Sequence, residues 1–319
     1  MGIKLLNSFI KSKCGIRGPI DDRLKIKSNR IKCLPISIIS FKHLRNKSLS
    51  IDISIYMYRF IEERKLEENM HKLCKLFLKY NINPIFVFDG KPPKEKWDEI
   101  IKRDEYKKQI EKEYNKLLTS GETNFEIMSR MEELRKQMIR VTKEHIDTTK
   151  AIIDSYGFNR ITAKREAEEL CVEYVYKKHS YACVTDDMDV FAYNCSRVLR
   201  EMDIYSETFV LYNFRQICKK INIDPHNFRI LCCISGNDYE KGINNIYINF
   251  NLLIKYKKQK DKNFKIVKFK EDYKNIYKYG LLHYLLIHEH INVERLKTFV
   301  KLYNMYDLTN KDVLGEHSI

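Results

Sequence analysis

The sequence predicts an α/β protein in which a mostly parallel central sheet is flanked by helices. Short β-rich runs alternate with helical patterns along the chain, which is typical of βαβ units. The composition, 44% hydrophobic and 32% charged, is that of a globular protein. A length of 319 residues suffices for about two domains with a substantial core.

The β-rich runs are expected to form strands because they are apolar, rich in β-branched residues and bounded by polar or helical segments. They lie at 48–53, 83–88, 158–162, 181–185 and 197–199, with a hairpin around 205–212. Helical patterns lie between these runs, such as the one from Met57 to Tyr80, whose apolar residues include Phe60, Leu73 and Phe77. The alternation therefore supports the parallel sheet.

One segment interrupts the alternation. From 94 to 145 the chain is highly charged, has no strand pattern and carries only a thin apolar stripe on each of two helical stretches. Such a stripe predicts a helical hairpin that is solvated on most faces and inserted into the fold. A surface helix pair without a special role would show the same pattern.

The composition changes again after Phe250. Residues 251–319 contain lysines interleaved with aromatic and aliphatic residues, followed by helical patterns. This predicts a basic C-terminal helical region beside a core of residues 1–250. Basic residues interleaved with aromatics fit a surface that follows a phosphate backbone, and a solvated lysine-rich helix face fits equally well.

The charge balance indicates the class of partner. Lys and Arg total 59 against 43 Asp and Glu, a formal charge of +16. Nucleic acid is the first partner this suggests and an acidic membrane surface the second, while a generally basic surface without a specific partner remains an alternative.

Nine cysteines without a C-x-x-C pair predict a reduced, intracellular protein, nuclear or cytoplasmic. No apolar run approaches the ~20 residues of a membrane span, and MGIKLLNSFI does not fit a signal peptide.

Acidic side chains follow most of the predicted strands. Asp52 ends the first run, Asp89 ends the second, and TDDMD follows the run at 181–185. A glutamate cluster opens the helix after the run at 158–162. Its members are Glu166, Glu168 and Glu169. Because ligands bind at the carboxyl ends of parallel strands, we expect these acids at one edge of the sheet.

Clustered carboxylates repel one another unless cations neutralise them. Hard divalent ions with oxygen ligands, Mg²⁺ first and Mn²⁺ as the alternative, are the natural occupants. Two ions about 4 Å apart suit in-line displacement at phosphorus, one activating water and the other stabilising the leaving oxygen. A basic protein with an acidic pocket is therefore predicted to hydrolyse phosphodiesters.

In these features the sequence resembles the flap endonuclease and xeroderma pigmentosum G family of structure-specific 5′ nucleases. The likeness runs in order through about the first 240 residues. It is carried by MGI, IDIS, VFDGKPP, RVTKEH, REAEE, TDDMD and GNDY. The resemblance implies a PIN-like 5′ nuclease core in residues 1–250, in which residues 94–145 form the arch that receives a free 5′ strand.

The resemblance also implies roles for particular residues. Seven carboxylates would bind two Mg²⁺ ions: Asp52, Asp89, Glu166, Glu168, Asp187, Asp189 and Asp238. Lys96 and Arg103, two helical turns apart on one face, would reach the scissile phosphate. Tyr58 would stack on a base, unless it is a core tyrosine, and Gly2 would lie near the site. Asp186 and Glu169 would be neighbours of the ligands.

Two stretches depart from the family pattern. The chain is longer between MGIKLLNSFI and IDIS, where we expect a surface loop. After GNDY the family has a glycine-rich turn that grips duplex DNA, but here Asn244, Asn245 and Tyr247 stand where glycines are expected. The C-terminal KDVLGEHSI contains no recognisable sliding-clamp peptide. The Lys-, Ile- and Asn-rich composition suggests an AT-rich genome and a compact member of the family, of viral or of cellular origin.

The expected function is a metal-dependent 5′ nuclease that cuts flap, nicked or branched DNA in replication, repair or recombination. Two alternatives stay open at the level of sequence. One is a non-catalytic nucleic-acid-binding protein with the same fold. The other is a 5′-3′ exonuclease on DNA or RNA, because contacts to a phosphate backbone distinguish the two only where a group probes the 2′-hydroxyl.

Overall fold

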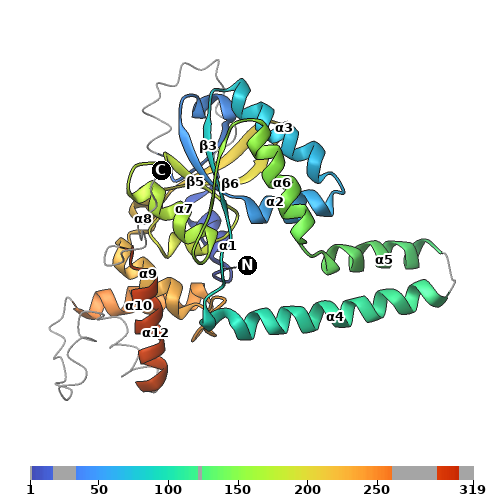
Figure 1. The fold of residues 1–319 in the computed structure, drawn as a ribbon. Helices are drawn as coiled ribbons and strands as arrows, with labels where there is room; N and C mark the ends of the chain where they lie inside the picture. Colours follow the sequence, from blue (N-terminus) through green and yellow to red (C-terminus); the bar gives the residue numbers. More distant parts are fainter. Residues whose placement is uncertain (1, 17–33, 121–123, 261–292, 309–319) are drawn as a thin grey trace. The chain divides into compact units, whose positions relative to one another are not determined.

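The computed structural model describes residues 2–16, 34–120, 124–260 and 293–308, drawn as a ribbon in Figure 1. Its central sheet has seven strands in the order β1-β7-β6-β5-β2-β3-β4. The predicted α/β class is confirmed, with a mixed sheet. The chain divides into two compact units, and each is described by itself.

The first unit comprises Phe41–Ala167 and Met202–Thr208 and is called the arch unit. Its strands are β2 (Ser48–Asp52), β3 (Asn83–Phe88) and β4 (Asn159–Thr162), all predicted from the sequence. They pair in parallel, with Asp52 opposite Val87 and Phe88 opposite Thr162. Parallel pairing requires crossover helices, and here these are α2 (Ile53–Glu62), α3 (Leu66–Lys79) and α6 (Lys143–Ser155).

Aromatic rings join the helices of the arch unit to its strands. The ring of Phe77 on α3 lies 6.0 Å from that of Phe86 on β3 and 6.3 Å from that of Phe158, centroid to centroid. Helix α6 begins with a capping box formed by Thr142 and His145. This packing holds the ends of β2 and β3 in place.

The single helix predicted from Met57 to Tyr80 is wrong. The structure has two helices, α2 and α3, separated at residues 63–65. Arg64 adopts a left-handed conformation there, with φ of 56°, and the Lys65 N–H bonds to the Phe60 carbonyl oxygen. No Gly or Pro marks this break in the sequence, which is why the helical pattern did not reveal it.

The predicted helical hairpin is present. Helices α4 (Trp97–Ser120) and α5 (Phe125–Met138) pack against each other, preceded by the short helix η3 (Lys94–Lys96). Asn124 caps α5 by accepting a hydrogen bond from the Ile127 N–H. Figure 1 shows the two helices side by side, extending away from the strands of their unit.

The second unit comprises Met1–Ser40, Glu168–Glu201 and Phe209–Ile319 and is called the acidic-loop unit. It holds β1 (Ile36–Ser40), β5 (Ala182–Val184) and most of β6 (Arg197–Asp203) and β7 (Thr208–Asn213). Strands β5 and β6 pair in parallel. The turn at 204–207 forms the expected hairpin, with longer strands than predicted. Strand β1, whose ISIIS sequence carries a β-branched signal, was not predicted.

In the core of the acidic-loop unit, the ring of Phe191 contacts those of Tyr212 and Phe214, and the ring of Phe214 contacts that of Phe228. The unit also contains several α-helices. They are α1 (Leu6–Cys14), α7 (Ala167–Tyr176, whose first residue belongs to the arch unit), α8 (Phe214–Ile221), α9 (Pro225–Ile234), α10 (Ile246–Lys260) and α12 (Val293–Met305).

The cysteines that the structure describes are free, and all of them except Cys14 are buried. None of the described helices has the length and apolar character that a membrane crossing requires. Most of the inserted stretch near the N-terminus, most of the basic run after Phe250 and the C-terminal KDVLGEHSI lie outside the described residues. The sequence-based division at residue 250 stays a prediction.

Candidate metal centre

The arch unit places three of the predicted carboxylates around the ends of β2 and β3. Asp52 is the buried last residue of β2. Asp89 follows β3 and accepts a 2.9 Å hydrogen bond from the Ala167 N–H at the start of α7. Gly90 packs against the backbone of residues 163–164 so closely that a Cβ there would lie 2.0 Å from the Ala163 carbonyl oxygen. Asp89 therefore lies beside the segment that carries Glu166.

Glu166 and Lys96 form an ion pair in the arch unit. The Lys96 ammonium contacts the Glu166 carboxylate directly, and both side chains are nearly nine-tenths buried. A partly buried pair of this kind is screened by solvent far less than a surface pair. The structure therefore brings a predicted phosphate-binding lysine to a predicted metal ligand.

The other two residues of this unit that are predicted to contact the substrate, Arg103 and Tyr58, are more exposed than Lys96. Arg103 lies two turns beyond Lys96, and its Nε donates a 3.1 Å hydrogen bond to Glu99 on the same helix. Tyr58 on α2 is 39% exposed, so the core alternative is wrong for it. The Nζ of Lys107, one turn beyond Arg103, lies 5.4 Å from the centroid of the Tyr58 ring. The ring is thus open to solvent beside a cation of α4.

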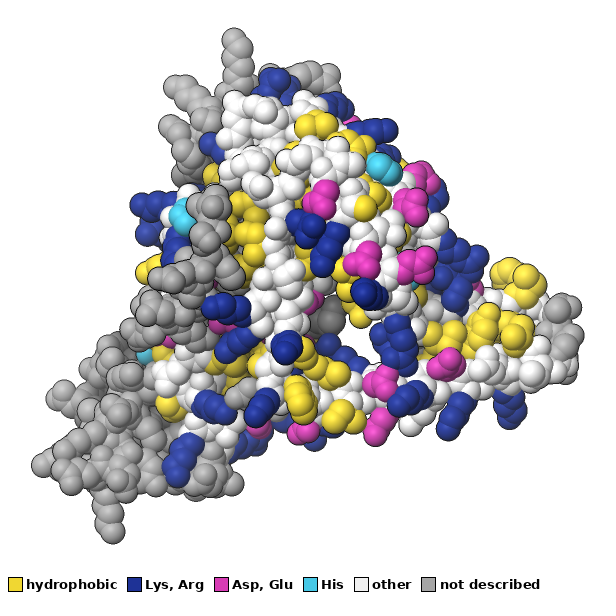
Figure 2. Space-filling view, viewed as in Figure 1, with side chains coloured by type: hydrophobic (Ala, Val, Ile, Leu, Met, Phe, Trp, Pro, Cys, Tyr) yellow, Lys and Arg dark blue, Asp and Glu magenta, His cyan; other side chains and the backbone are white. Residues whose placement is uncertain are grey.

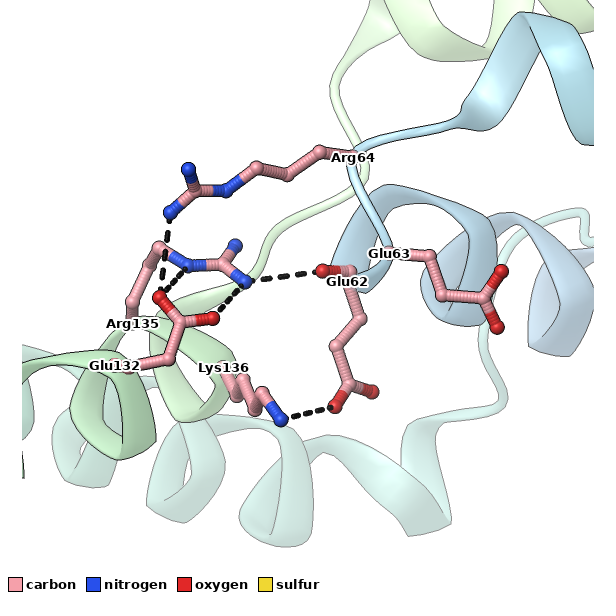
Figure 3. A pocket seen from close by; sticks show the side chains of 6 residues that line it. All are labelled: Glu62, Glu63, Arg64, Glu132, Arg135 and Lys136. Atoms are coloured by element: carbon pink, nitrogen blue, oxygen red, sulfur yellow. Dashed lines mark hydrogen bonds and ion pairs between the residues drawn. The ribbon is translucent and has the colours of Figure 1, made fainter. Parts of the chain in front are cut away.

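An ion-pair network attaches the arch to the turn between α2 and α3, as Figure 3 shows. Glu132 on α5 binds Arg135 at 2.6 Å and Arg64 at 3.3 Å. Arg135 also donates to the Glu62 carbonyl oxygen at 3.0 Å, and Lys136 lies 3.8 Å from the Glu62 carboxylate. These residues, with Glu63, line a surface pocket of about 460 Å³. The guanidinium of Arg135 lowers the pKa of Glu132 to about 2.

In the acidic-loop unit, the residues after β5 form a tightly bonded loop, Thr185–Asp189. The Asp187 N–H donates to Thr185 Oγ1 at 3.1 Å, and the Asp189 N–H donates to Asp187 Oδ1 at 2.8 Å. Both carboxylates are buried, and Asp189 is only 1% exposed. The loop therefore holds two predicted ligands side by side.

Asp186, the third acid of this loop, is bonded to β6. Its Oδ1 accepts a 2.7 Å hydrogen bond from the Glu201 N–H, and its carbonyl oxygen accepts one of 2.7 Å from Arg200 Nη2. Arg200 is buried beside it. Asp186 thus fixes the backbone from which Asp187 projects.

Gly2 is buried against the same loop. A Cβ at Gly2 would lie 2.3 Å from Asp187 Oδ1 and 2.7 Å from Asp189 Oδ1. The backbone conformation, with φ of 75°, is also one that side chains rarely adopt. The predicted proximity of Gly2 to the acids is therefore present, and only glycine fits there.

Three acids remain. Glu168 and Glu169 are buried at the start of α7. Asp238 is half-buried in the turn between α9 and α10, where Asn237 Oδ1 accepts hydrogen bonds from the N–H groups of Tyr239 and Glu240.

The altered turn after GNDY keeps two glycines at its base. A Cβ at Gly242 would lie 2.4 Å from the Ser235 carbonyl carbon, and Gly236 has φ of 87°. Asn245 caps α10 by accepting hydrogen bonds from the Tyr247 and Ile248 N–H groups. The asparagine that replaces an expected glycine therefore begins the next helix.

Sequence reasoning missed Tyr306, which follows α12. Its hydroxyl donates a 3.2 Å hydrogen bond to Asp189 Oδ2, and the side chain is completely buried. Burial, followed by the nearby Asp189 charge, holds the pKa of Tyr306 well above its usual range. No pattern in VKLYNMYDL distinguishes Tyr306 from an ordinary apolar-face aromatic.

The donor set fits a hard divalent cation in its chemistry. All seven candidates are carboxylates, the oxygen ligands that Mg²⁺ prefers, and four of them are buried: Asp52, Glu168, Asp187 and Asp189. The close approach of Gly2 leaves two of them without a covering side chain on that face. Across the described residues, however, no three His, Cys, Asp or Glu side chains form a ready metal-binding group.

The fold resembles solved nucleases. The catalytic core of Rad2 in complex with a DNA substrate matches with a TM-score of 0.62 and 20% identity, over 100% of this chain and 90% of that one. The flap endonuclease-1 of Methanococcus jannaschii matches with a TM-score of 0.50 and 22% identity, over 85% and 96% of the two chains. Sheet and arch thus define the α/β PIN-like nuclease fold.

Sequence comparison gives the family. Residues 1–110 match the XPG N-terminal domain and residues 157–238 the XPG I-region, together more than half of the chain. Flap endonuclease 1-B of Xenopus laevis is 29% identical over 219 residues, and flap endonuclease 1 of Drosophila yakuba is 28% identical over 224. The alignments cover 63% and 64% of this chain but only 56% of each curated relative. The chain belongs to the flap endonuclease and XPG family.

Proposed function

We propose that the protein is a metal-dependent, structure-specific 5′ nuclease that hydrolyses phosphodiester bonds in flap, nicked or branched DNA. The observation that carries the proposal is the pairing of buried aspartates in the Thr185–Asp189 loop beside Gly2. Buried acids without a cation destabilise a fold. A purely structural role therefore leaves these buried aspartates unexplained, whereas a metal-binding role accounts for them.

The seven carboxylates would bind two Mg²⁺ ions, with Mn²⁺ as the alternative. They are Asp52, Asp89, Glu166, Glu168, Asp187, Asp189 and Asp238. Mg²⁺ is named with a relative, the Holliday junction-resolving enzyme GEN1 with product DNA, which matches with a TM-score of 0.51. Bound divalent ions supply Lewis-acid stabilisation of the charge that develops on the phosphodiester.

The basic groups of α4 would act on the same phosphate. Lys96 already binds a carboxylate oxygen, so its ammonium is suited to a phosphate oxygen, which offers similar charge. Arg103 offers a planar fork for two oxygens of one phosphate. Tyr58 would stack on a base, and the arch would receive the free 5′ strand. The basic C-terminal region, residues 251–319, would add contacts to the duplex.

The cellular setting follows from this activity. A nuclease for branched DNA works where DNA is replicated or repaired, in the nucleus or in a cytoplasmic viral replication compartment. The basic charge of +16 suits such a polyanionic partner.

The test uses labelled 5′ flap, nicked, blunt and single-stranded substrates, in DNA and RNA versions, with Mg²⁺ or EDTA. We expect the protein to cut the DNA flap substrate near the flap junction. EDTA should abolish this cleavage. Asp187→Asn should lower the rate by more than about 100-fold, because several kcal/mol of transition-state stabilisation are lost.

Asp154→Asn is the matched control. Asp154 is an exposed aspartate of the arch unit paired with Arg160, so its neutralisation should leave cleavage unchanged. Tight DNA binding without cleavage of any substrate would instead indicate the non-catalytic alternative. Cleavage confined to 5′ ends of RNA would indicate the exonuclease alternative.

A further inference from the structure

Helix α12 and the two residues that follow it contact three parts of the acidic-loop unit. Arg295, in its first turn, donates two 2.9 Å hydrogen bonds to the carbonyl oxygens of Lys241 and Gly242. Tyr303 bonds His226 of α9 at 2.7 Å, and Asp307 lies 3.4 Å from Arg229. The third attachment is the Tyr306 hydroxyl on Asp189.

The Tyr306 contact is more than general packing. The ring is fully buried and lies edge-on to Tyr193, 4.8 Å between centroids, so its position is fixed. The hydroxyl points at Oδ2 of Asp189, and the Asp189 backbone N–H bonds Asp187 Oδ1. One hydrogen bond from the C-terminal helix thus orients one carboxylate of a coupled pair.

We propose that Tyr306 is a positioning residue for a divalent cation held by Asp187 and Asp189, so that α12 completes the metal centre. Groups that hydrogen-bond to metal ligands fix the ligand orientation and typically change metal affinity by about 10- to 100-fold when removed. The inference rests on the proposed function. The inference extends the proposed function because it makes the metal site depend on a helix that lies outside both matched family models.

Tyr303 on α12 and Tyr306 directly after it give a matched pair of variants. Tyr306→Phe removes the hydroxyl that binds Asp189, and Tyr303→Phe removes one that binds His226. Both side chains are buried, so each variant loses one buried hydrogen bond and keeps its ring.

Mn²⁺ binding to the DNA-free protein is measured by electron paramagnetic resonance, and thermal unfolding is recorded for each variant. We expect Tyr306→Phe to weaken Mn²⁺ affinity about tenfold and Tyr303→Phe to leave it within twofold, at similar melting temperatures. Unchanged affinity in Tyr306→Phe, or an equal loss in Tyr303→Phe, would overturn the proposal.

A measurement on the unmodified chain covers the case in which Tyr306→Phe fails to fold. Because coupling between two sites is reciprocal, saturating Mn²⁺ should slow amide hydrogen exchange in 293–305 and leave α3 unaffected. No change in 293–305 would contradict the proposal. Asp187→Asn separates the two hypotheses: if it retains full Mn²⁺ affinity, the metal site itself is wrong, whereas a loss there without any effect of Tyr306→Phe refutes only the role of Tyr306.

Discussion

At Gly2 a single missing methyl group decides whether two aspartates keep their places. The Cβ of any other residue would overlap Asp187 Oδ1 and approach Asp189 Oδ1 closely. The clash is with two buried carboxylates that the loop Thr185–Asp189 holds rigidly through its own hydrogen bonds. The loop therefore has little freedom to move away.

Gly2→Ala should consequently lower the single-turnover cleavage rate by more than about tenfold, since displaced ligands lose their geometry. Gly15→Ala is the control. Gly15 also has a positive φ, of 69°, but a Cβ there meets nothing within 4 Å. It should cost about 1–3 kcal/mol of stability through backbone strain alone and leave the cleavage rate unchanged. Equal rates in the Gly2→Ala variant and the unmodified protein would refute the close packing.

Lys96 is the second residue whose role is open to test. Lys96→Met removes the charge and keeps most of the side-chain length. We expect the single-turnover rate to fall about 100- to 1000-fold, because a preorganised charge next to the reacting phosphate is lost. DNA affinity, measured by fluorescence anisotropy, should change only a few-fold.

Lys108→Met on the same helix is the comparison for Lys96. Lys108 is exposed and pairs with Asp104 one turn away, so both rate and affinity should be preserved. If Lys108→Met slows cleavage as much as Lys96→Met, the effect belongs to the charge of α4 as a whole.

At the scale of elements, charged contacts link the arch to the rest of its unit. Figure 2 shows basic and hydrophobic side chains together over α4 and α5. Helix α5 has a single buried residue, Leu134. Its link to the α2–α3 turn consists of exposed ion pairs around Glu132 and Glu62, and exposed pairs are individually weak and screened by salt. The contacts of Glu132, Arg135 and Lys136 with Arg64 and Glu62 therefore form a weak, salt-sensitive attachment of α5, called the latch.

The latch should open at low pH and at high salt. Arg135 lowers the folded-state pKa of Glu132 to about 2. Glu132 must be ionised to pair with Arg135 on its own helix and with Arg64 of the α2–α3 turn. The stabilisation from these pairs is present above the ordinary carboxyl pKa of about 4.3 and disappears as the pH falls from there towards about 2. Amide hydrogen exchange of α5 should therefore speed up over this range, after correction for the intrinsic pH dependence of exchange.

Glu132→Gln should make α5 exchange as fast at pH 7 as the unmodified chain does at low pH. Glu113→Gln is the control, because Glu113 pairs with Arg130 within the hairpin and not with the α2–α3 turn. Protection of α5 that is independent of both pH and Glu132 would show that apolar packing, not charge, holds the arch.

For the molecule as a whole, net charge governs the encounter with DNA. The chain carries +16, and each phosphate neutralised by a Lys or Arg releases a counterion. Affinity for a flap substrate should therefore fall about 10³- to 10⁵-fold between about 50 and 200 mM salt if some 6–10 phosphates are contacted. A titration by fluorescence anisotropy in Ca²⁺ measures the slope. An affinity that does not respond to salt would exclude the basic surface as the main source of binding.

The sequence by itself determined the α/β class, six of the seven described strands, the helical hairpin and the candidate metal ligands that follow strands. These are local properties of the sequence. The alternation of β-rich runs and helical patterns predicts the strands, and a candidate ligand at the end of a strand can be recognised once the strand is predicted. Asp52, Asp89 and the Asp187–Asp189 pair could be named for this reason. The break at Arg64 was missed because no Gly or Pro marks it in the sequence.

Only the tertiary structure decided which distant residues meet these acids. Lys96 reaches Glu166 across 70 residues, and Tyr306 reaches Asp189 across 117. Arg200 holds Asp186 because β6 runs beside β5. Each contact depends on how strands and helices pack, and packing is set by the shape of the whole core. A periodic pattern records which face of an element is buried, but it does not record what that face is buried against.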